Sequence, residues 1–217
     1  MSTETIAGIR KDRLQAFAAR EAAVYAKARP KAAAALKKGT GNFLSGVPMH
    51  WMADWPMPHL PLVASAKGAR IEDIDGNRLD DFCLGDTGSM FGHSPAPVAK
   101  AIRAQARHGL TYMLPTEAAL EAGRLLTERF GRFHWQIATT ATDANRFALR
   151  VARAITGRPK VLVFNGCYHG TVDETFVSLE NGVTVTSPGL LGQINDLTVT
   201  ATCCEFNDLA GVEAALA

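Results

Sequence analysis

The sequence predicts an α/β fold that contains a parallel sheet, and three features support this prediction. Gln136–Thr139 and Lys160–Phe164 are short apolar stretches of the length expected for buried strands. Asp143–Thr156, between them, has the apolar spacing of an amphipathic helix. Gly157 follows at the position where a glycine commonly ends a helix. A strand, a helix and a strand in this order predict a βαβ unit with a right-handed crossover.

The chain before this unit is expected to begin with helix and to continue as an irregular segment. Arg10–Lys38 is rich in alanine and charged residues, which predicts a helix interrupted at Pro30. Gly39–Pro61 has no regular period and is rich in glycine and proline, as is typical of an irregular segment that lies on another surface. Its large apolar side chains fit either a substrate pocket or a subunit interface, and both alternatives remain open. These side chains are Trp51, Met52, Trp55 and Met57.

A small antiparallel sheet is predicted after this segment, because three short stretches alternate in polarity and turn residues separate the last two. The stretches are Leu62–Ala66, Arg70–Ile74 and Arg78–Phe82, with the turn at Asp75-Gly76-Asn77. The remaining predicted elements are a glycine-rich loop at Gly85–His93, helices at Pro97–His108 and Glu117–Phe130, a strand at Val199–Cys203 and a helix from Leu209.

The chain is expected to have two parts. Residues 1–96 form an N-terminal segment of helix, apolar loop and antiparallel sheet, and residues 97–217 begin a larger α/β domain. The final helix has no capping glycine or polar tail, although its alanines and leucines favour a surface that they can cover. We therefore expect this larger domain to be truncated at its C-terminus.

Composition and charge favour a cytoplasmic protein with a small-molecule partner. Lys and Arg number 23 against 21 Asp and Glu, which indicates neither a nucleic-acid nor a membrane partner. No apolar run has the length of a membrane span, and the first forty residues lack the apolar core of a signal peptide. The four cysteines form no CxxC pair, which argues against a disulfide framework or a structural zinc site.

The junction between the predicted strand and helix, Ala138–Asn145, has the features of an anion site. Backbone N–H groups at a helix start point toward solvent, and the helix dipole adds partial positive charge there. The hydroxyl groups of Thr140 and Thr142 add further donors for phosphate oxygens, next to the N–H group of Ala141. The alternative is that Thr140 or Thr142 only caps the helix.

A second candidate stretch, Phe164–Gly170, leaves the carboxyl end of the next predicted strand, where open α/β sheets bind ligands. The ring of Tyr168 is suited to stack on a planar cofactor, and the imidazole of His169 can donate a hydrogen bond or move a proton. Packing for Tyr168 and a structural hydrogen bond for His169 remain the alternatives. Cys167 and His169 are too few ligands for a metal site, so no metal is predicted.

These segments together resemble the class III aminotransferases, and within them the branch that includes glutamate-1-semialdehyde aminomutase. The resemblance covers roughly Gly46 to Ala217. Its motifs, in chain order, are Ile71–Asn77 followed by Asp81-Phe82, then Gly92–Pro95, Thr140–Asn145, Ala148–Ala154 with Thr156-Gly157-Arg158, and Tyr168-His169-Gly170.

The resemblance implies a fold-type-I enzyme that uses pyridoxal 5′-phosphate. In the family, the positions of Thr140, Ala141 and Thr142 hold the cofactor phosphate, that of Tyr168 stacks on the pyridine ring, and that of His169 lies beside it. The family usually has serine, glycine, threonine and glutamate where this chain has Thr140–Asp143. A methyl group at Ala141 weakens binding if the family's glycine needs a positive φ or touches phosphate.

Two further family residues lie downstream of Ala217: the aspartate that pairs with the pyridinium nitrogen and the Schiff-base lysine. No catalytic residue is therefore assigned in this chain, and no lysine in it is proposed as a replacement. The resemblance implies amino-group transfer between an amino compound and an oxo acid or aldehyde, or the intramolecular version performed by the aminomutase.

It also implies a homodimer, with Gly39–Pro61 and Asp86–Phe91 as candidate substrate-pocket or interface contacts. Two other hypotheses remain: a non-catalytic remnant that binds the cofactor or phosphate, and an unstable half-domain. The half-domain hypothesis arises because parallel strands depend on neighbouring strands for their stability.

Overall fold

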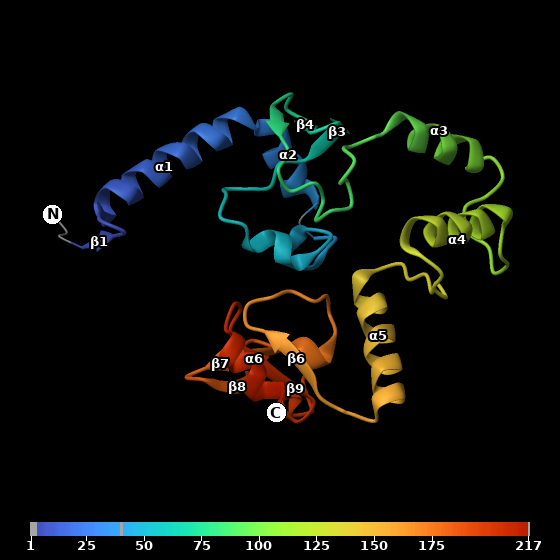
Figure 1. Cartoon of the computed structure of the whole chain (residues 1–217). Coiled ribbons are helices and arrows are strands. Elements are labelled where there is room, and N and C mark those ends of the chain that lie inside the picture. The colour runs from blue at the N-terminus through green and yellow to red at the C-terminus, as the bar shows by residue number, and fades with distance from the viewer. Residues whose placement is uncertain (1–3, 40, 217) are drawn as a thin grey trace. The chain divides into compact units, whose positions relative to one another are not determined.

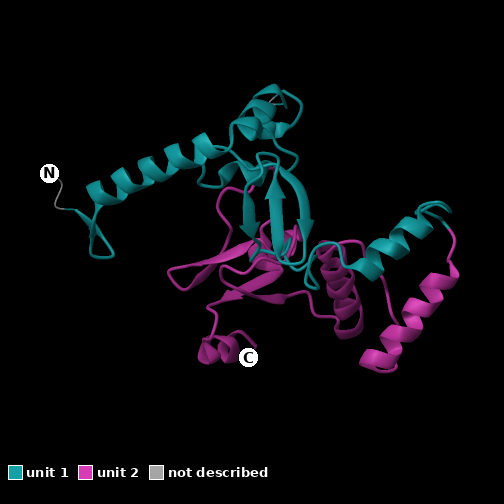
Figure 2. Ribbon diagram, turned by 90° about the horizontal axis from the view of Figure 1, so that it is seen from above, with its two compact units in different colours: residues 1–113 teal, residues 114–217 magenta. Residues whose placement is uncertain are grey.

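The structure is a computed structural model that describes residues 4–39 and 41–216 (Figure 1). The chain forms two compact units, residues 1–113 and 114–217, which Figure 2 colours separately. Their boundary follows helix α3 (Ala96–Gln105), whereas the sequence analysis placed the domain boundary just before it. The division of the chain at residue 96 therefore stays a prediction.

The first unit begins with two short strands, β1 (Thr5–Ile6) and β2 (Ile9–Arg10), and the helices α1 (Lys11–Ala28) and α2 (Pro30–Gly39). The predicted interruption at Pro30 is confirmed, because proline lacks the N–H group that would continue the α1 ladder. The segment after α2 is irregular, as predicted, with short 3₁₀ turns at Leu44–Gly46 and His50–Asp54.

The predicted antiparallel sheet is confirmed in the first unit. Its strands are β3 (Val63–Lys67), β4 (Arg70–Asp73) and β5 (Arg78–Asp80), hydrogen-bonded in the order β3-β4-β5. The side chain of Asp81, just after β5, accepts a 2.6 Å hydrogen bond from Nε2 of His93. This bond lowers the pKa of the Asp81 carboxyl and ties the glycine-rich loop to the end of the sheet.

A buried ion pair connects the helices to this sheet. Nε of Arg29, between α1 and α2, lies 3.0 Å from Oδ2 of Asp73, whose side chain is fully buried. Asp73 also accepts hydrogen bonds from the backbone N–H groups of Asp75 and Asn77 and from the Asn77 amide. Burial acts to raise the pKa of Asp73, but these hydrogen bonds and the charge of Arg29 outweigh it and lower that pKa.

The same turn fixes the start of α2. The carboxylate of Asp75 accepts hydrogen bonds from the backbone N–H groups of Lys31 (2.8 Å) and Ala32 (2.9 Å). On the other side, the guanidinium of Arg29 lies over the ring of Tyr25, 4.2 Å from its centroid. The Asn77 amide donates to the carbonyl of Ala28 at the end of α1 (3.1 Å), so the loop between β4 and β5 is bound to both N-terminal helices.

The second unit contains the predicted helices α4 (Glu117–Phe130) and α5 (Ala141–Thr156). The Thr116 hydroxyl caps α4 by accepting a hydrogen bond from the N–H group of Ala119, and α5 ends at Gly157, which has a left-handed φ of 66°. None of the helices within residues 4–39 and 41–216 is long and apolar enough to cross a membrane.

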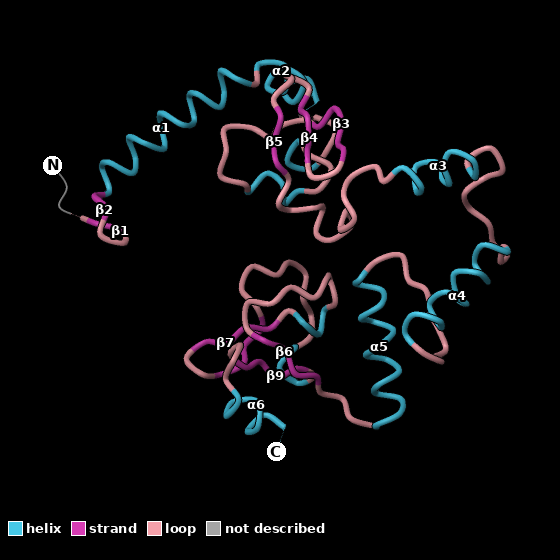
Figure 3. Tube along the Cα trace, turned by 45° about the horizontal axis from the view of Figure 1, so that its top comes forward, coloured by secondary structure: helices cyan, strands magenta, loops and turns pink. Residues whose placement is uncertain are grey.

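The parallel pairing in this unit joins β6 (Val161–Phe164) to β9 (Ala201–Cys204), which lie side by side in Figure 3. Between them the chain forms an antiparallel hairpin of β7 (Val177–Glu180) and β8 (Val183–Thr186), which the sequence analysis missed. Helix α6 (Leu209–Leu216) follows β9. The core of this unit consists of Val163, Val177, Leu197, Ala201 and Cys203.

The predicted strand at Gln136–Thr139 is wrong. This segment has no strand pairing within the described residues and bends at Thr139, and Ile137 is 69% exposed. A buried parallel strand requires neighbours that satisfy its backbone groups, and β6 pairs with β9 instead. The α/β class with a parallel pair is confirmed, but the first strand of the expected βαβ unit does not form within the described residues.

Candidate functional site

The first turn of α5 is held by a reciprocal capping interaction. The hydroxyl oxygen of Thr140 accepts a hydrogen bond from the backbone N–H group of Asp143 (3.1 Å), and the same hydroxyl donates to the Asp143 carboxylate (2.9 Å). Thr140 therefore caps the helix, and its only hydroxyl hydrogen is used by Asp143.

Donors remain at Ala141 and Thr142. Their backbone N–H groups occupy the first two positions of α5, where a helix supplies no acceptor. The Thr142 hydroxyl accepts a hydrogen bond from the N–H group of Thr171 (3.0 Å) and donates its own hydrogen to no other described residue. Ala141 has no positive φ, so its methyl group causes no backbone strain of the kind that would require glycine.

The loop after β6 lies against this helix start. The side-chain amide of Asn145 donates to the backbone carbonyl of His169 (2.9 Å), and the Thr142 hydroxyl binds the N–H group of Thr171. Gly170, between these two loop residues, has a φ of 79°, and a Cβ atom there would lie 2.3 Å from Oγ1 of Thr142. The two stretches that the sequence analysis singled out are therefore adjacent.

Tyr168 and His169 differ in their surroundings. Tyr168 is 81% exposed, so its ring is free to stack on a ligand. Nε2 of His169 is buried and has no hydrogen-bond partner among the described residues. Both residues line a pocket of about 330 Å³ that also includes Ser178, whose buried hydroxyl likewise has no partner in the described part of the chain.

Behind the loop, an ion pair fixes its far end to α5. Nη1 of Arg153 lies 2.7 Å from the carboxylate of Glu174, and both side chains are about three-quarters buried. The hydrogen bond from Arg153 lowers the pKa of the Glu174 carboxyl. Arg146 adds a longer hydrogen bond to the carbonyl of Thr171 (3.3 Å).

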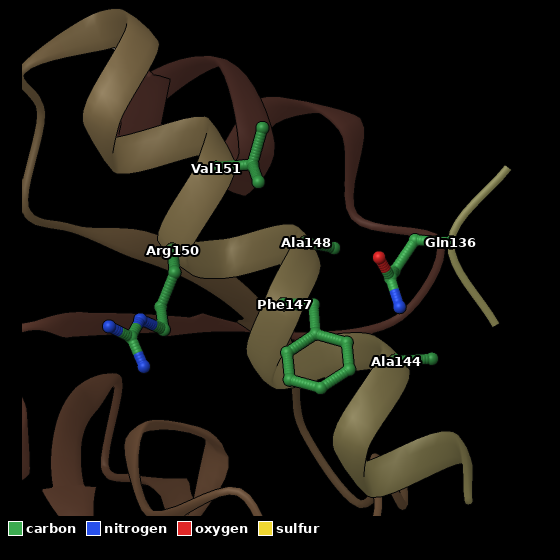
Figure 4. A pocket seen from close by; sticks show the side chains of 6 residues that line it. All are labelled: Gln136, Ala144, Phe147, Ala148, Arg150 and Val151. Atoms are coloured by element: carbon green, nitrogen blue, oxygen red, sulfur yellow. The ribbon is translucent and has the colours of Figure 1, made fainter. Parts of the chain in front are cut away.

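A larger pocket, of about 660 Å³, runs along another face of α5 and contains none of the five predicted site residues. Figure 4 shows its lining side chains, among them Phe147 and Val151 on the helix and Gln136 from the segment before it. Most of this lining is apolar and it includes neither of the N–H groups at the start of α5, so the cluster at that helix start is the better candidate site for an anion.

The residues at the start of α5 fit a phosphorylated planar cofactor. Two free backbone N–H groups and one hydroxyl hydrogen are suited to phosphate oxygens, and an exposed aromatic ring follows on the adjacent loop. Gly170 leaves open a space that any side chain would fill. The sequence analysis assigned no role to Asn145, because the acceptor of its amide is a carbonyl from a distant part of the chain.

Comparison with known proteins agrees with this reading. The family described as Aminotransferase class-III matches residues 52–209. Glutamate-1-semialdehyde 2,1-aminomutase of Desulfitobacterium hafniense is 35% identical over 156 residues, which are 70% of this chain and 36% of that protein. The corresponding enzyme of Thermoplasma acidophilum is 32% identical over 180 residues, 81% of this chain and 42% of that protein.

Solved structures show the same relationship. A glutamate-1-semialdehyde aminomutase from Pseudomonas aeruginosa PAO1 is similar with a TM-score of 0.89 and 45% identity, over 96% of this chain and 46% of that one. An omega-transaminase from Sphaerobacter thermophilus has a TM-score of 0.75 and 30% identity, over 85% of this chain and 44% of that one. The chain thus spans less than half the length of these relatives.

The solved relatives also agree with the predicted cofactor. The Pseudomonas enzyme was crystallised in complex with PMP, and a transaminase of 28% identity was solved with PLP bound. The predicted fold class and cofactor are therefore confirmed at the level of the family. With a family match over residues 52–209 and a described fold that follows its solved members, the chain belongs to the class III aminotransferases.

Proposed function

We propose that this chain supplies the phosphate-binding and ring-stacking part of a pyridoxal-phosphate-dependent aminotransferase. The observation that carries the proposal is the junction of α5 with the Tyr168 loop, where free hydrogen-bond donors and an exposed aromatic ring lie on adjacent segments. When bound, the cofactor supplies an electron sink for the α-carbon of an amino substrate.

In this proposal the phosphate is bound by Thr142 and Ala141 more than by Thr140. The N–H groups of Ala141 and Thr142 and the hydroxyl hydrogen of Thr142 are available as donors, and the helix dipole favours the negative charge. Thr140 shapes the site as the helix cap. The proposal thus limits Thr140 to capping the helix, because its hydroxyl hydrogen is donated to Asp143.

The remaining predicted residues hold the ring. Tyr168 stacks on the pyridine face, where its exposed position allows close contact. His169 lies beside it, and its unpartnered Nε2 can give or accept a hydrogen bond to the cofactor or to a water molecule. By itself, the 217-residue chain is proposed to bind the cofactor without turnover, because none of its lysines matches the family's Schiff-base position.

For the whole protein we propose amino-group transfer between an amino compound and an oxo acid or aldehyde, as a cytoplasmic homodimer. A second candidate is an aminomutase, which is favoured by the names of the curated relatives and by the 45% identity to the Pseudomonas enzyme. Release of a deaminated donor by the whole protein separates the two, since a transaminase releases that oxo product, whereas an aminomutase moves the amino group to another carbon of the same molecule.

The phosphate assignment is tested by titrating the 217-residue chain with pyridoxamine phosphate and following its fluorescence. Thr142→Val removes a donor to an anion and is expected to weaken binding about tenfold or more. Thr142→Ser retains the hydroxyl and should restore most of the affinity.

Thr140→Ala is the matched control on the neighbouring hydroxyl. It should cost about 1 kcal/mol of stability through the lost cap and change the affinity by about twofold at most. Equal losses of affinity in the Thr140 and Thr142 variants would contradict the assignment. Failure of the unaltered chain to bind pyridoxamine phosphate would overturn the proposed function.

A further inference from the structure

We propose that Asn145 is a positioning residue, which sets the distance between the ring-stacking loop and the phosphate-binding start of α5. The inference rests on the proposed function and adds to it a residue that does not itself touch the cofactor. The bond that carries it runs from the Asn145 amide to the backbone carbonyl of His169, with a length of 2.9 Å.

This bond lies where it can restrain the position of the Tyr168 ring. Asn145 lies within the first turns of α5, so its backbone is fixed by the helix that presents the free N–H groups. The carbonyl that it holds belongs to His169, the residue directly after Tyr168. Of the contacts described between α5 and this loop, the Asn145 bond therefore acts nearest to the stacking ring.

The other contacts cannot replace it. The Thr142 hydroxyl and the Arg146 guanidinium both bind the backbone of Thr171, on the far side of Gly170 from Tyr168. Gly170 has a positive φ and no side chain, so it transmits constraint poorly from Thr171 back to Tyr168. Without the Asn145 side chain, the peptide next to Tyr168 would lose its link to α5. The two half-sites, which are the phosphate-binding start of α5 and the ring-stacking loop, would both remain.

A ligand that carries both a phosphate and a ring binds at two points. Its affinity depends on each point and on how well the two are spaced before binding, because ordering a loop at the moment of binding costs free energy. A ligand that uses only one of the two points gains nothing from the spacing. Asn145 should therefore matter for pyridoxamine phosphate and not for phosphate or the unphosphorylated ring alone.

The experiment compares three ligands on the 217-residue chain: pyridoxamine phosphate and pyridoxamine by fluorescence, and inorganic phosphate by ³¹P NMR. Asn145→Ala is expected to weaken pyridoxamine phosphate about three- to tenfold, the range for one lost hydrogen bond. Binding of inorganic phosphate and of pyridoxamine should stay within about twofold of the unaltered chain, because each uses a single half-site.

Two variants control this comparison. Ala148→Ser changes an exposed residue of the same helix that has no described contact with the loop, and should leave all three affinities unchanged. Asn145→Gln keeps an amide donor on a longer side chain and should recover part of the lost affinity. It also provides the measurement if the alanine variant does not fold, as judged by its thermal melt.

The outcomes are distinct. An equal loss for phosphate and for pyridoxamine phosphate would make Asn145 a simple support of the helix start and overturn the positioning role. Unchanged affinity for pyridoxamine phosphate in Asn145→Ala would overturn it as well. If the unaltered chain binds no pyridoxamine phosphate, the proposed function fails first and the positioning role falls with it.

Discussion

The polar cluster of the first unit and that of the second use their hydrogen-bonding groups in opposite ways. Both carboxylate oxygens of Asp73 accept hydrogen bonds, and the guanidinium of Arg29 lies within ion-pair distance of this carboxylate. At the start of α5, the N–H groups of Ala141 and Thr142 and Nε2 of His169 are left without acceptors or donors among the described residues.

This difference separates stability from binding. A buried carboxylate whose two oxygens are held by hydrogen bonds and a nearby cation stabilises the fold and has no capacity left for a ligand. A cluster with unused donors at a helix start stabilises the fold less but can bind an anion. Substitutions in the first cluster should therefore change unfolding, and substitutions in the second should change ligand affinity.

The largest effect is expected from Asp73→Ala, which leaves Arg29 buried without its counter-charge. Breaking a buried ion pair from one side costs about 3–5 kcal/mol. Urea unfolding followed by the fluorescence of Trp51 and Trp55, in a Trp135→Phe background, reports on the first unit alone. Ligand affinity at the start of α5 should remain unchanged.

Asp80→Ala is the matched control for this prediction, because its ion pair with Arg70 is exposed on both sides. Exposed pairs contribute about 0–1 kcal/mol, so the midpoint should hardly move. A stability loss in Asp73→Ala no greater than in this control would contradict the claim that the first cluster is structural. The double variant with Arg29→Met should recover part of the loss, since it removes the unpaired charge.

Gly170→Ala tests the second cluster and should have an intermediate effect. The new Cβ atom would lie 2.3 Å from Oγ1 of Thr142, so the loop must move away from α5. We expect a stability loss of about 1–3 kcal/mol and a loss of pyridoxamine phosphate affinity of about tenfold or more. Isothermal titration and a thermal melt measure the two quantities.

Gly189→Ala separates close approach from backbone strain in that test. Gly189 has a φ of 81°, close to that of Gly170, but apart from its own and its chain neighbours' atoms no described atom lies within 4 Å of where its Cβ would be. Gly189→Ala should therefore cause the same backbone strain as Gly170→Ala and leave the affinity for pyridoxamine phosphate unchanged. Equal affinity losses in the two alanine variants would show that positive φ, and not contact with Thr142, limits the site.

The smallest effect is expected from acid and concerns the first unit. The hydrogen bond from His93 lowers the pKa of the Asp81 carboxyl below its ordinary value of 3.8. Its stabilising contribution is present above that value and is lost as the pH falls through the lower folded-state pKa. Urea midpoints of the unaltered chain and of His93→Ala should therefore converge in acid; a constant gap would contradict this coupling.

The sequence predicted the parts of the fold that local chemistry decides. The start of α4 follows from the cap at Thr116, and the end of α5 follows from Gly157. The missed hairpin also had a local signal, since Asn181-Gly182 joins β7 and β8 and both residues have positive φ. Gln136–Thr139 failed because a buried parallel strand is decided by its neighbours and not by its own composition.

The candidate site was predictable in its parts and not in its connections. Small and hydroxyl residues before a helix, and a tyrosine after a strand, pointed to the two segments that the structure places next to each other, and their binding roles stay a prediction. The link through Asn145, and the use of the Thr140 hydroxyl by Asp143, depend on where separate segments meet in space. Only the three-dimensional structure reveals which of two neighbouring threonines keeps a hydrogen to donate.

The arrangement of strands in the second unit sets an order of events in folding. The hairpin of β7 and β8 closes through a two-residue turn, a process that takes about 1–10 μs. The pairing of β6 with β9 must wait until the whole intervening chain, including that hairpin, has been brought together. Strand β6 therefore stays unpaired until β9 has been synthesised and brought back to it, and its backbone edge is open to wrong partners for that interval.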